Sequence, residues 1–276
     1  MRSNGPISMP VHIDDPDDLR IAAFRNVRER DLVGREGLFI AEGEVVLRVL
    51  LDSPLCRPAL ILIAESRAES LAPLLARAPV TVPVYTAGQE VLDAIAGFHL
   101  HRGILALGAP IARPSVADLL ASLPEQALVV GLFGIGNHDN MGGIFRNAAA
   151  FGANAVILAS DCCDPFYRKA IRVSVGACLA TPFAWATADE DAVAQLEQAG
   201  FKVFALSPGG KLALDELQRP ARAAVLFGAE GSGLPEKVLA RATSVRIPMA
   251  GKMDSLNVAT SSGIVLQLFA KGPAGA

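Results

Sequence analysis

The chain has 276 residues, with 25 Lys and Arg against 28 Asp and Glu, a formal net charge of −3. With 51% apolar and 19% charged residues it is neither disordered nor fibrous, and it is long enough for one large domain or two ordinary ones. No apolar run approaches the roughly 18 residues of a membrane span. The near-neutral charge means that any nucleic-acid binding must come from local basic patches rather than from a global field.

The N-terminal residues and the cysteines indicate an intracellular protein. Residues 1–16 are acidic and contain no apolar core of a signal peptide, so we predict a flexible tail there. The cysteines lack the paired spacing of metal ligands, and the adjacent pair is not a CxxC motif. We therefore expect reduced thiols, no bound metal and a cytoplasmic location. The four cysteines are Cys56, Cys162, Cys163 and Cys178.

Residues 17–108 alternate helix-like and strand-like segments, which predicts a small α/β sandwich. The expected helices are 19–30, 43–51 and 66–76, and the expected strands are 38–41, 59–64, 80–85 and 103–107. A stretch punctuated by proline, residues 109–126, is predicted to be a linker. A second domain is predicted over 127–276.

The second half repeats the alternation with more strongly apolar strands. The expected strands are 128–133, 155–159, 202–206, 223–227 and 244–248, and the expected helices are 141–151, 190–199 and 255–270. A continuous apolar strand such as LVVGLF is typical of a parallel sheet that is covered on both faces. The pattern predicts an open, mostly parallel sheet with helices on both faces and a ligand site outside the carboxyl ends of its strands.

Three polar or glycine-rich loops follow strands at that predicted edge: GIGNHDNMGG, GAEGSGL and MAGKMDSLN. In the first, Asn140 is a candidate N-cap for a helix that begins at Met141. In the last, Ser255 is a candidate N-cap, which places Asn257 in the first helical turn. The middle loop has neither GxGxxG nor GK[ST], which disfavours a nicotinamide-dependent oxidoreductase.

Taken together, the loops carry three ordered motifs. They are N-x-G-x-x-x-R-N-A-x-x-F-G at 140–152, L-F-G-A-E-G-x-G-L at 226–234, and I-P-M-x-G-x-x-x-S-L-N-V-A at 247–259. This set resembles the signature motifs of the SpoU/TrmH family of RNA ribose 2′-O-methyltransferases. The segments Y-R-K-A-I-R-V-S-V-G-A at 167–177 and R-E-G-L-F-I-A-E-G-E-V-V at 35–46 also resemble the family, the second its substrate-binding domain. The resemblance covers about residues 19–270.

The resemblance implies a trefoil-knotted SPOUT fold for the C-terminal domain and S-adenosyl-L-methionine (AdoMet) as the cofactor. It places AdoMet against the backbone of Gly228, Ile247 and Leu256. It also implies a catalytic set of Asn140, Arg146, Glu230, Ser255 and Asn257.

The implied reaction is attack of a ribose 2′-hydroxyl on the methyl group of AdoMet. A guanidinium is almost always protonated, so we expect Arg146 to fix the phosphate and ribose and to stabilise the developing alkoxide. Asn140 and Asn257 are expected to hold Arg146 and the loop. Family members usually have Asp-Pro where this chain has Asn137-His138. His138 is thus one candidate proton acceptor, beside an RNA phosphate or water.

RNA affinity is expected from two basic clusters, since phosphate contacts position RNA without reading its sequence. The candidate residues are Arg25, Arg28 and Arg35, with Arg20 and Arg30 beside them, and Arg168, Lys169 and Arg172. The alternative for the first cluster is a solvated helix face partly neutralised by Glu29 and Asp31. We expect rRNA as the substrate; the alternatives are tRNA and a non-catalytic RNA-binding protein on the same fold.

A homodimer through the C-terminal domain is also expected. We do not expect one sheet to cover all the apolar positions of the two predicted helices, and the resemblance implies pairing of the knotted domains, as in other family members. The positions are Ile144 and Phe145 in one helix and Leu256, Val258, Val265, Leu268 and Phe269 in the other.

Overall fold

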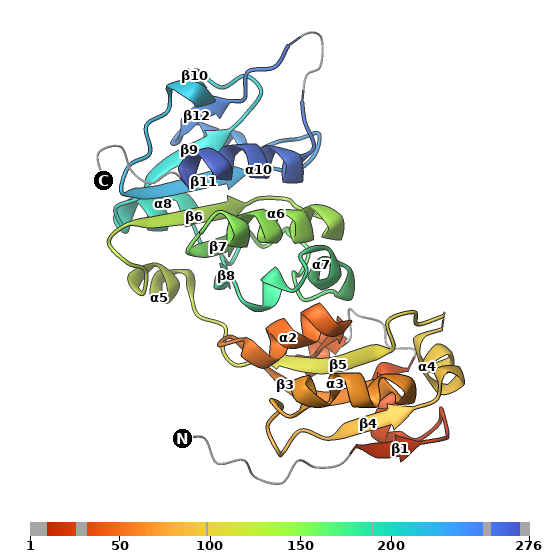
Figure 1. Ribbon diagram of the computed structural model, residues 1–276. Helices are drawn as coiled ribbons and strands as arrows, with labels where there is room; N and C mark the ends of the chain where they lie inside the picture. The colour runs from red at the N-terminus through yellow and green to blue at the C-terminus, as the bar shows by residue number, and fades with distance from the viewer. Residues whose placement is uncertain (1–9, 26–31, 98, 189, 251–254, 271–276) are drawn as a thin grey trace. The chain divides into compact units, whose positions relative to one another are not determined.

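A computed structural model describes residues 10–25, 32–97, 99–188, 190–250 and 255–270 (Figure 1). The chain divides into two compact units. The first unit is Met1–Ala112 together with Phe166–Ala180, and the second is Arg113–Pro165 together with Thr181–Ala276. Phe166–Ala180 thus packs with the first unit, although the sequence boundaries place it in the second domain. Across the described ranges, no helix has both the length and the apolar character to span a membrane.

A five-stranded mixed sheet in the order β1-β4-β3-β5-β2 forms the first unit. The strands are β1 (Val11–Ile13), β2 (Phe39–Glu42), β3 (Cys56–Ala64), β4 (Val84–Ala87) and β5 (Ile104–Pro110). β4 is parallel to β1 and β3, whereas β5 is antiparallel to β3 and β2. The prediction of a tail is wrong for Val11–Ile13, because this three-residue segment pairs with β4 and is too short to show a strand periodicity.

Helices lie against the sheet of the first unit. They are α2 (Glu44–Asp52), α3 (Ala68–Leu75), α4 (Gln89–Ala96) and α7 (Arg168–Val173). Val91 and Ile95 of α4 are buried with Leu62 of β3. Phe166, just before α7, stacks on Phe39 of β2 with ring centroids 4.9 Å apart. The predicted helix 19–30 is a 3₁₀ helix over Leu19–Phe24, and residues 26–31 lie outside the described residues.

The second unit contains a seven-stranded parallel sheet in the order β10-β12-β9-β11-β6-β7-β8. The strands are β6 (Ala127–Leu132), β7 (Ala155–Leu158), β8 (Phe183–Trp185), β9 (Lys202–Leu206), β10 (Leu212–Ala213), β11 (Arg222–Phe227) and β12 (Thr243–Arg246). Each neighbouring pair is parallel. The predicted open parallel sheet is confirmed, and the added strands β8 and β10 have only three and two residues.

Helices cover both faces of this sheet, as predicted (Figure 1). They are α5 (Val116–Ala121), α6 (His138–Ala150), α8 (Ala192–Gln198), α9 (Glu236–Leu239) and α10 (Val258–Phe269). Side chains alternate along β9: Val203 and Ala205 join the core beneath α5 and α8, whereas Phe204 contacts Phe269 of α10. α5 lies within the stretch 109–126 that was predicted to be a linker.

The two helices that follow the motif loops begin at residues other than those predicted. α6 starts at His138, three residues early, because the side chain of Asn137 caps it by accepting from the Asp139 N–H at 2.7 Å. α10 starts at Val258, and its N-cap is Asn257 rather than Ser255. The predicted start is late for α6 and early for α10, because several polar residues near each start can cap a helix and only the folded chain selects one of them.

In the expected trefoil knot, the C-terminal helix passes through a loop. Residues 251–254, shortly before this helix, lie outside the described residues, and the knot stays a prediction.

Candidate functional site

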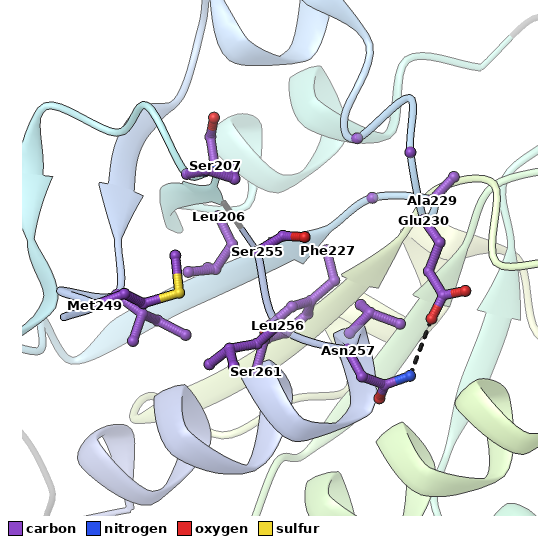
Figure 2. Close-up of a pocket in the computed structure, with 16 residues that line it drawn as sticks. Leu206, Ser207, Phe227, Ala229, Glu230, Met249, Ser255, Leu256, Asn257 and Ser261 are labelled. Carbon is purple, nitrogen blue, oxygen red and sulfur yellow. Dashed lines mark hydrogen bonds between the residues drawn. The ribbon is translucent and has the colours of Figure 1, made fainter. Parts of the chain in front are cut away.

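A cavity of about 500 Å³ opens at the carboxyl ends of β9, β11 and β12, the edge that parallel-sheet topology predicts for a ligand (Figure 2). Leu206, Phe227 and Met249 give it an apolar wall. The other lining residues come from the motif loops: Gly228, Ala229, Glu230, Gly231, Gly233, Ile247, Ser255, Leu256, Asn257, Val258 and Ser261, with Ser207 and Pro208 after β9.

Glycines shape the loop that follows β11. A Cβ atom on Gly228 would lie 2.2 Å from the carbonyl carbon of Gly233, so a side chain cannot be accommodated there. The Gly233 N–H donates to the Ala229 carbonyl at 3.0 Å, and Gly231 and Gly233 have φ of +89° and +69°. The loop therefore doubles back on itself and presents main chain to the cavity.

Three side chains from three motifs form one hydrogen-bond network beside this loop. Glu230 Oε1 accepts from Asn140 Nδ2 and from Asn257 Nδ2, both at 2.9 Å, and Asn257 Nδ2 also reaches Asn140 Oδ1 at 2.9 Å. Figure 2 shows Glu230 and Asn257 facing each other on the side of the cavity opposite Met249. Asn140 is only 6% exposed. The network fixes the orientation of the Glu230 carboxylate at the cavity wall.

Asn257 is also the N-cap of α10. Its Oδ1 accepts from the backbone N–H groups of Ala259 at 2.9 Å and Thr260 at 3.2 Å, which caps α10. One amide side chain therefore sets both the start of α10 and the position of Glu230.

The structure brings most of the predicted site residues to this cavity. Gly228, Ile247, Leu256 and Ser255 line it, as do Glu230 and Asn257. Arg146 lies on α6 with its side chain exposed. The amides of Asn140 and Asn257 bond to Glu230 and to each other, and within the described residues neither is hydrogen-bonded to Arg146 as expected. The predicted hold on Arg146 is therefore absent from this arrangement.

Asn147 is a positioning residue that the sequence reasoning missed. Its Nδ2 donates to the Ala259 carbonyl at 2.7 Å and to Ser262 Oγ at 2.9 Å, which joins α6 to the start of α10. Asparagine is a poor helix former, so its place inside a predicted helix was the available signal. Asp161 was also missed: its Oδ1 accepts from the Gly134 N–H at 2.9 Å and holds the loop after β6.

Two cysteines with raised pKa values, Cys162 and Cys163, lie close to the loop after β6. All four cysteines are free. Burial raises the pKa of Cys162 to about 11 and that of Cys163 to about 12. Among the described residues, no group of three or more His, Cys, Asp and Glu side chains is arranged to hold a metal ion.

The predicted RNA-binding residues occupy different environments in the first unit. Arg168 pairs with Glu42, Nη2 to Oε2 at 2.9 Å, with 18% and 9% of the two side chains exposed. Arg25 pairs with Asp17, whereas Lys169 and Arg172 are exposed. Arg28 and Arg30 lie outside the described residues, as does the side chain of Arg35. RNA binding by the whole set stays a prediction.

The apolar residues behind the expected homodimer are mostly covered within the second unit. Ile144, Phe145, Val265 and Phe269 are fully buried, and Val258 is 8% exposed. The reasoning that one sheet leaves this surface uncovered is therefore wrong for these residues. Leu256 at 40% remains exposed. The homodimer stays a prediction that depends on the resemblance.

Comparisons with known proteins all find RNA methyltransferases. Residues 127–267 match the SpoU rRNA Methylase family. An uncharacterized tRNA/rRNA methyltransferase of Mycobacterium tuberculosis is 39% identical over 259 residues, which cover 91% of this chain and 88% of that protein.

Two solved structures share the fold over nearly the whole chain. The AdoMet-bound rRNA methyltransferase from Sinorhizobium meliloti has a TM-score of 0.80 and 24% identity, covering 94% of this chain and 97% of that one. An RNA 2′-O ribose methyltransferase has a TM-score of 0.70 and 24% identity, covering 93% and 97%.

Proposed function

Because this chain belongs to the SpoU rRNA methylase family, we propose that it methylates a ribose 2′-hydroxyl in structured RNA with AdoMet as the methyl donor. One observation carries the proposal. Residues from three motifs far apart in the sequence, Asn140, Glu230 and Asn257, form one network beside a cavity of cofactor size. A carboxylate held at the wall of a ligand-sized cavity favours an enzyme with a bound cofactor over a non-catalytic RNA-binding protein.

The cavity fits AdoMet in size and chemistry. Its volume of about 500 Å³ is within the usual range of small-molecule sites, roughly 300–1,000 Å³. The main chain around Gly228, Ile247 and Leu256 offers N–H and C=O groups to an adenosine, and Met249 and Leu206 offer apolar contact. The fixed Glu230 carboxylate suits a cationic ligand. When bound, AdoMet supplies a methyl group activated by its sulfonium charge.

The residues of this chain position and polarise the hydroxyl. Asn140 and Asn257 hold Glu230, and Asn257 also fixes α10 beneath the cavity. Arg146 is exposed on α6 and free to bind an RNA phosphate, where its permanent charge stabilises the developing alkoxide. The hydroxyl proton leaves to an RNA phosphate, to water or to His138 in the first turn of α6.

We further propose rRNA ahead of tRNA as the substrate, a homodimer formed through the second unit, a knotted C-terminal region and a cytoplasmic location. The M. tuberculosis relative is named for both tRNA and rRNA, which leaves tRNA as the alternative. Reverse-transcription stops at 2′-O-methyl positions, mapped in total RNA with and without the protein, identify the substrate and its nucleotide.

Methyl transfer and its position on the nucleotide are tested together. Calorimetry should show AdoMet binding, and labelled methyl should enter RNA at positions that then resist alkaline cleavage, because a methylated 2′-oxygen cannot attack the phosphate. Label that enters RNA without this resistance would contradict ribose methylation. No AdoMet binding, with or without RNA, would contradict the enzyme.

A further inference from the structure

A second cavity, of about 350 Å³, lies in the first unit, in a part of the chain without any of the proposed catalytic residues. Three arginines from separate segments line it: Arg67 after β3, Arg102 before β5 and Arg172 in α7. The remaining lining residues are Glu44, Val45, Val46 and Val175.

The carboxylate in this cavity is already neutralised. Glu44 accepts from Arg67 Nη2 at 3.0 Å through one oxygen and from Arg48 Nη2 at 3.0 Å through the other. Arg102 and Arg172 are both exposed, and in the described part of the chain no hydrogen bond or ion pair engages either guanidinium. The cavity thus has two guanidinium groups beyond those that Glu44 balances.

The surrounding structure leaves room for Arg102 and anchors the helix that carries Arg172. Gly43 has φ of +90°, and a Cβ atom there would lie 3.0 Å from Cδ of Arg102, so the glycine makes room for that side chain. The buried pair of Arg168 with Glu42 fastens α7, which carries Arg172, to β2. Arg172 is therefore presented by an anchored helix, and Arg102 by the turn that leads into β5.

The rim of the cavity is apolar and strained. Val175 has φ of 55°, an unfavourable value for a β-branched residue, and is 36% exposed. The next residue, Gly176, has φ of +86° and packs against Val49, which keeps the turn in this conformation. Val45, at the start of α2, is 55% exposed. Backbone strain of this kind is typical of binding sites.

We propose that this cavity binds one phosphodiester of the RNA backbone. Arg102 and Arg172 bind the phosphate oxygens, since the planar guanidinium matches phosphate geometry, and the adjoining nucleoside packs on Val45 and Val175. The contact recruits RNA without reading its sequence. This inference rests on the proposed RNA methyltransferase function and adds a backbone subsite within the first unit to it.

The test uses the full chain and the variants Arg102→Ala, Arg172→Ala and both together. Each single change should weaken RNA binding by about 3–10-fold and lower the slope of log affinity against log salt by about 1. AdoMet affinity should stay unchanged. Arg102→Lys and Arg172→Lys, which keep the charge without the planar fork, should restore part of the affinity.

Arg57→Ala is the matched control. Arg57 is an exposed arginine at the opposite end of β3, roughly 20 Å along the strand from Arg67 by strand geometry. The Arg57→Ala change should alter RNA affinity by less than about 2-fold, since we do not expect Arg57 to contact an RNA phosphate. An equal loss of affinity and slope for Arg57→Ala would overturn the site, because any arginine of this unit would then serve.

Inorganic phosphate could bind the same two arginines. Its affinity for the wild-type chain and the double variant is therefore measured separately. Unchanged RNA affinity and salt slope in the double variant, with or without loss of inorganic phosphate binding, would overturn an RNA subsite. Failure of the wild-type chain to bind AdoMet or transfer methyl would contradict the proposed function instead, and the effect of the double variant on RNA affinity would still be measurable.

Discussion

Arg146 stands apart from the other candidate catalytic side chains. Asn140, Glu230 and Asn257 are bonded to one another, whereas Arg146 is exposed on α6. A side chain that is held needs no substrate to order it, while an exposed guanidinium acquires its partner only with RNA. Substitutions in the network and substitutions of Arg146 should therefore have different effects on cofactor binding and on the methylation rate.

Replacing Arg146 by Ala should leave AdoMet affinity near normal, because Arg146 is not among the residues that line the cavity. The methylation rate should fall at least about 100-fold, the scale for losing one electrostatic contact to a transition state. Single-turnover methyl transfer measures the rate, and calorimetry measures AdoMet affinity. Arg146→Lys should recover part of the rate. A rate within a few-fold of wild type would remove Arg146 from the mechanism.

Asn257 caps α10 through its side-chain oxygen and donates to Glu230 through its side-chain nitrogen. Two variants distinguish the contributions of these two interactions. Asn257→Ser keeps a cap acceptor but lacks the amide that donates to Glu230, so AdoMet affinity and rate should fall while stability changes little. Asn257→Ala loses both functions and should also lower the unfolding free energy by about 1 kcal/mol. Denaturation with urea and calorimetry check the two variants together. Equal stability losses would show that the amide donor, not the cap, stabilises α10.

One buried and two partly buried thiols should make the protein less stable at alkaline pH. Burial raises the pKa of Cys56 to about 11, beside Cys162 at about 11 and Cys163 at about 12, against an ordinary value of 9.0. Above about pH 9 the unfolded chain releases these protons while the folded chain keeps them, so the unfolding free energy should decrease as pH rises. Urea denaturation at pH 8 and pH 10 measures this. The decrease should be smaller in Cys163→Ala; an unchanged decrease would contradict the assignment.

At the scale of helices, the active geometry depends on how closely α6 and α10 approach. Asn147 bonds across to Ala259 and Ser262, and a Cβ atom on Gly143 would lie 2.8 Å from Cβ of Ala259. The two helices carry Asn140 and Asn257 at their starts. Any separation of the helices therefore pulls the Glu230 network apart.

Gly143→Ala should destabilise the protein by about 1 kcal/mol. The crowding against Ala259 costs roughly 1–3 kcal/mol and exceeds the 0.5–1 kcal/mol that alanine gains over glycine in a helix. In the background of Ala259→Gly the same change should become neutral or stabilising, because the facing methyl group is gone. A double-mutant cycle of urea denaturation tests this. Additive effects would contradict the contact.

At the scale of the whole molecule, one segment packs in a different unit from its neighbours in sequence. Phe166–Ala180 follows β7 of the second unit in sequence but packs in the first. Phe166, Ile171 and Leu179 are 3%, 1% and 0% exposed there, and Gly176 lies against Val49. The chain therefore does not divide into two independent pieces at the predicted linker.

Residues 113–276 alone should consequently fold with an exposed apolar segment. We expect strong binding of the dye ANS and aggregation in light scattering, because Phe166, Ile171 and Leu179 lose their partners. Replacing residues 166–180 by a Gly/Ser linker in the same fragment should abolish both effects. A fragment that neither binds ANS nor aggregates without the replacement would show that the second unit covers the segment by itself.

The sequence by itself determined the features that depend on local pattern. The apolar runs of β6, β9 and β11 identify buried parallel strands, and their ends place the ligand site. The strands are properties of short segments, set by the side-chain period. The resemblance of the three motifs to the family identifies Gly228, Ile247 and Leu256, which line the cavity.

Only the tertiary structure decided which side chains meet. Asn140 bonds to residues 90 and 117 positions away, and no local pattern distinguishes this from a helix cap. α7 has only six residues, and its place beside β2 depends on two contacts. Arg168 pairs with Glu42, and Phe166 stacks on Phe39. Such contacts form only when distant parts of the chain come together in the fold. The free energy that selects them comes from burying these side chains against one another, not from interactions between neighbours in the sequence.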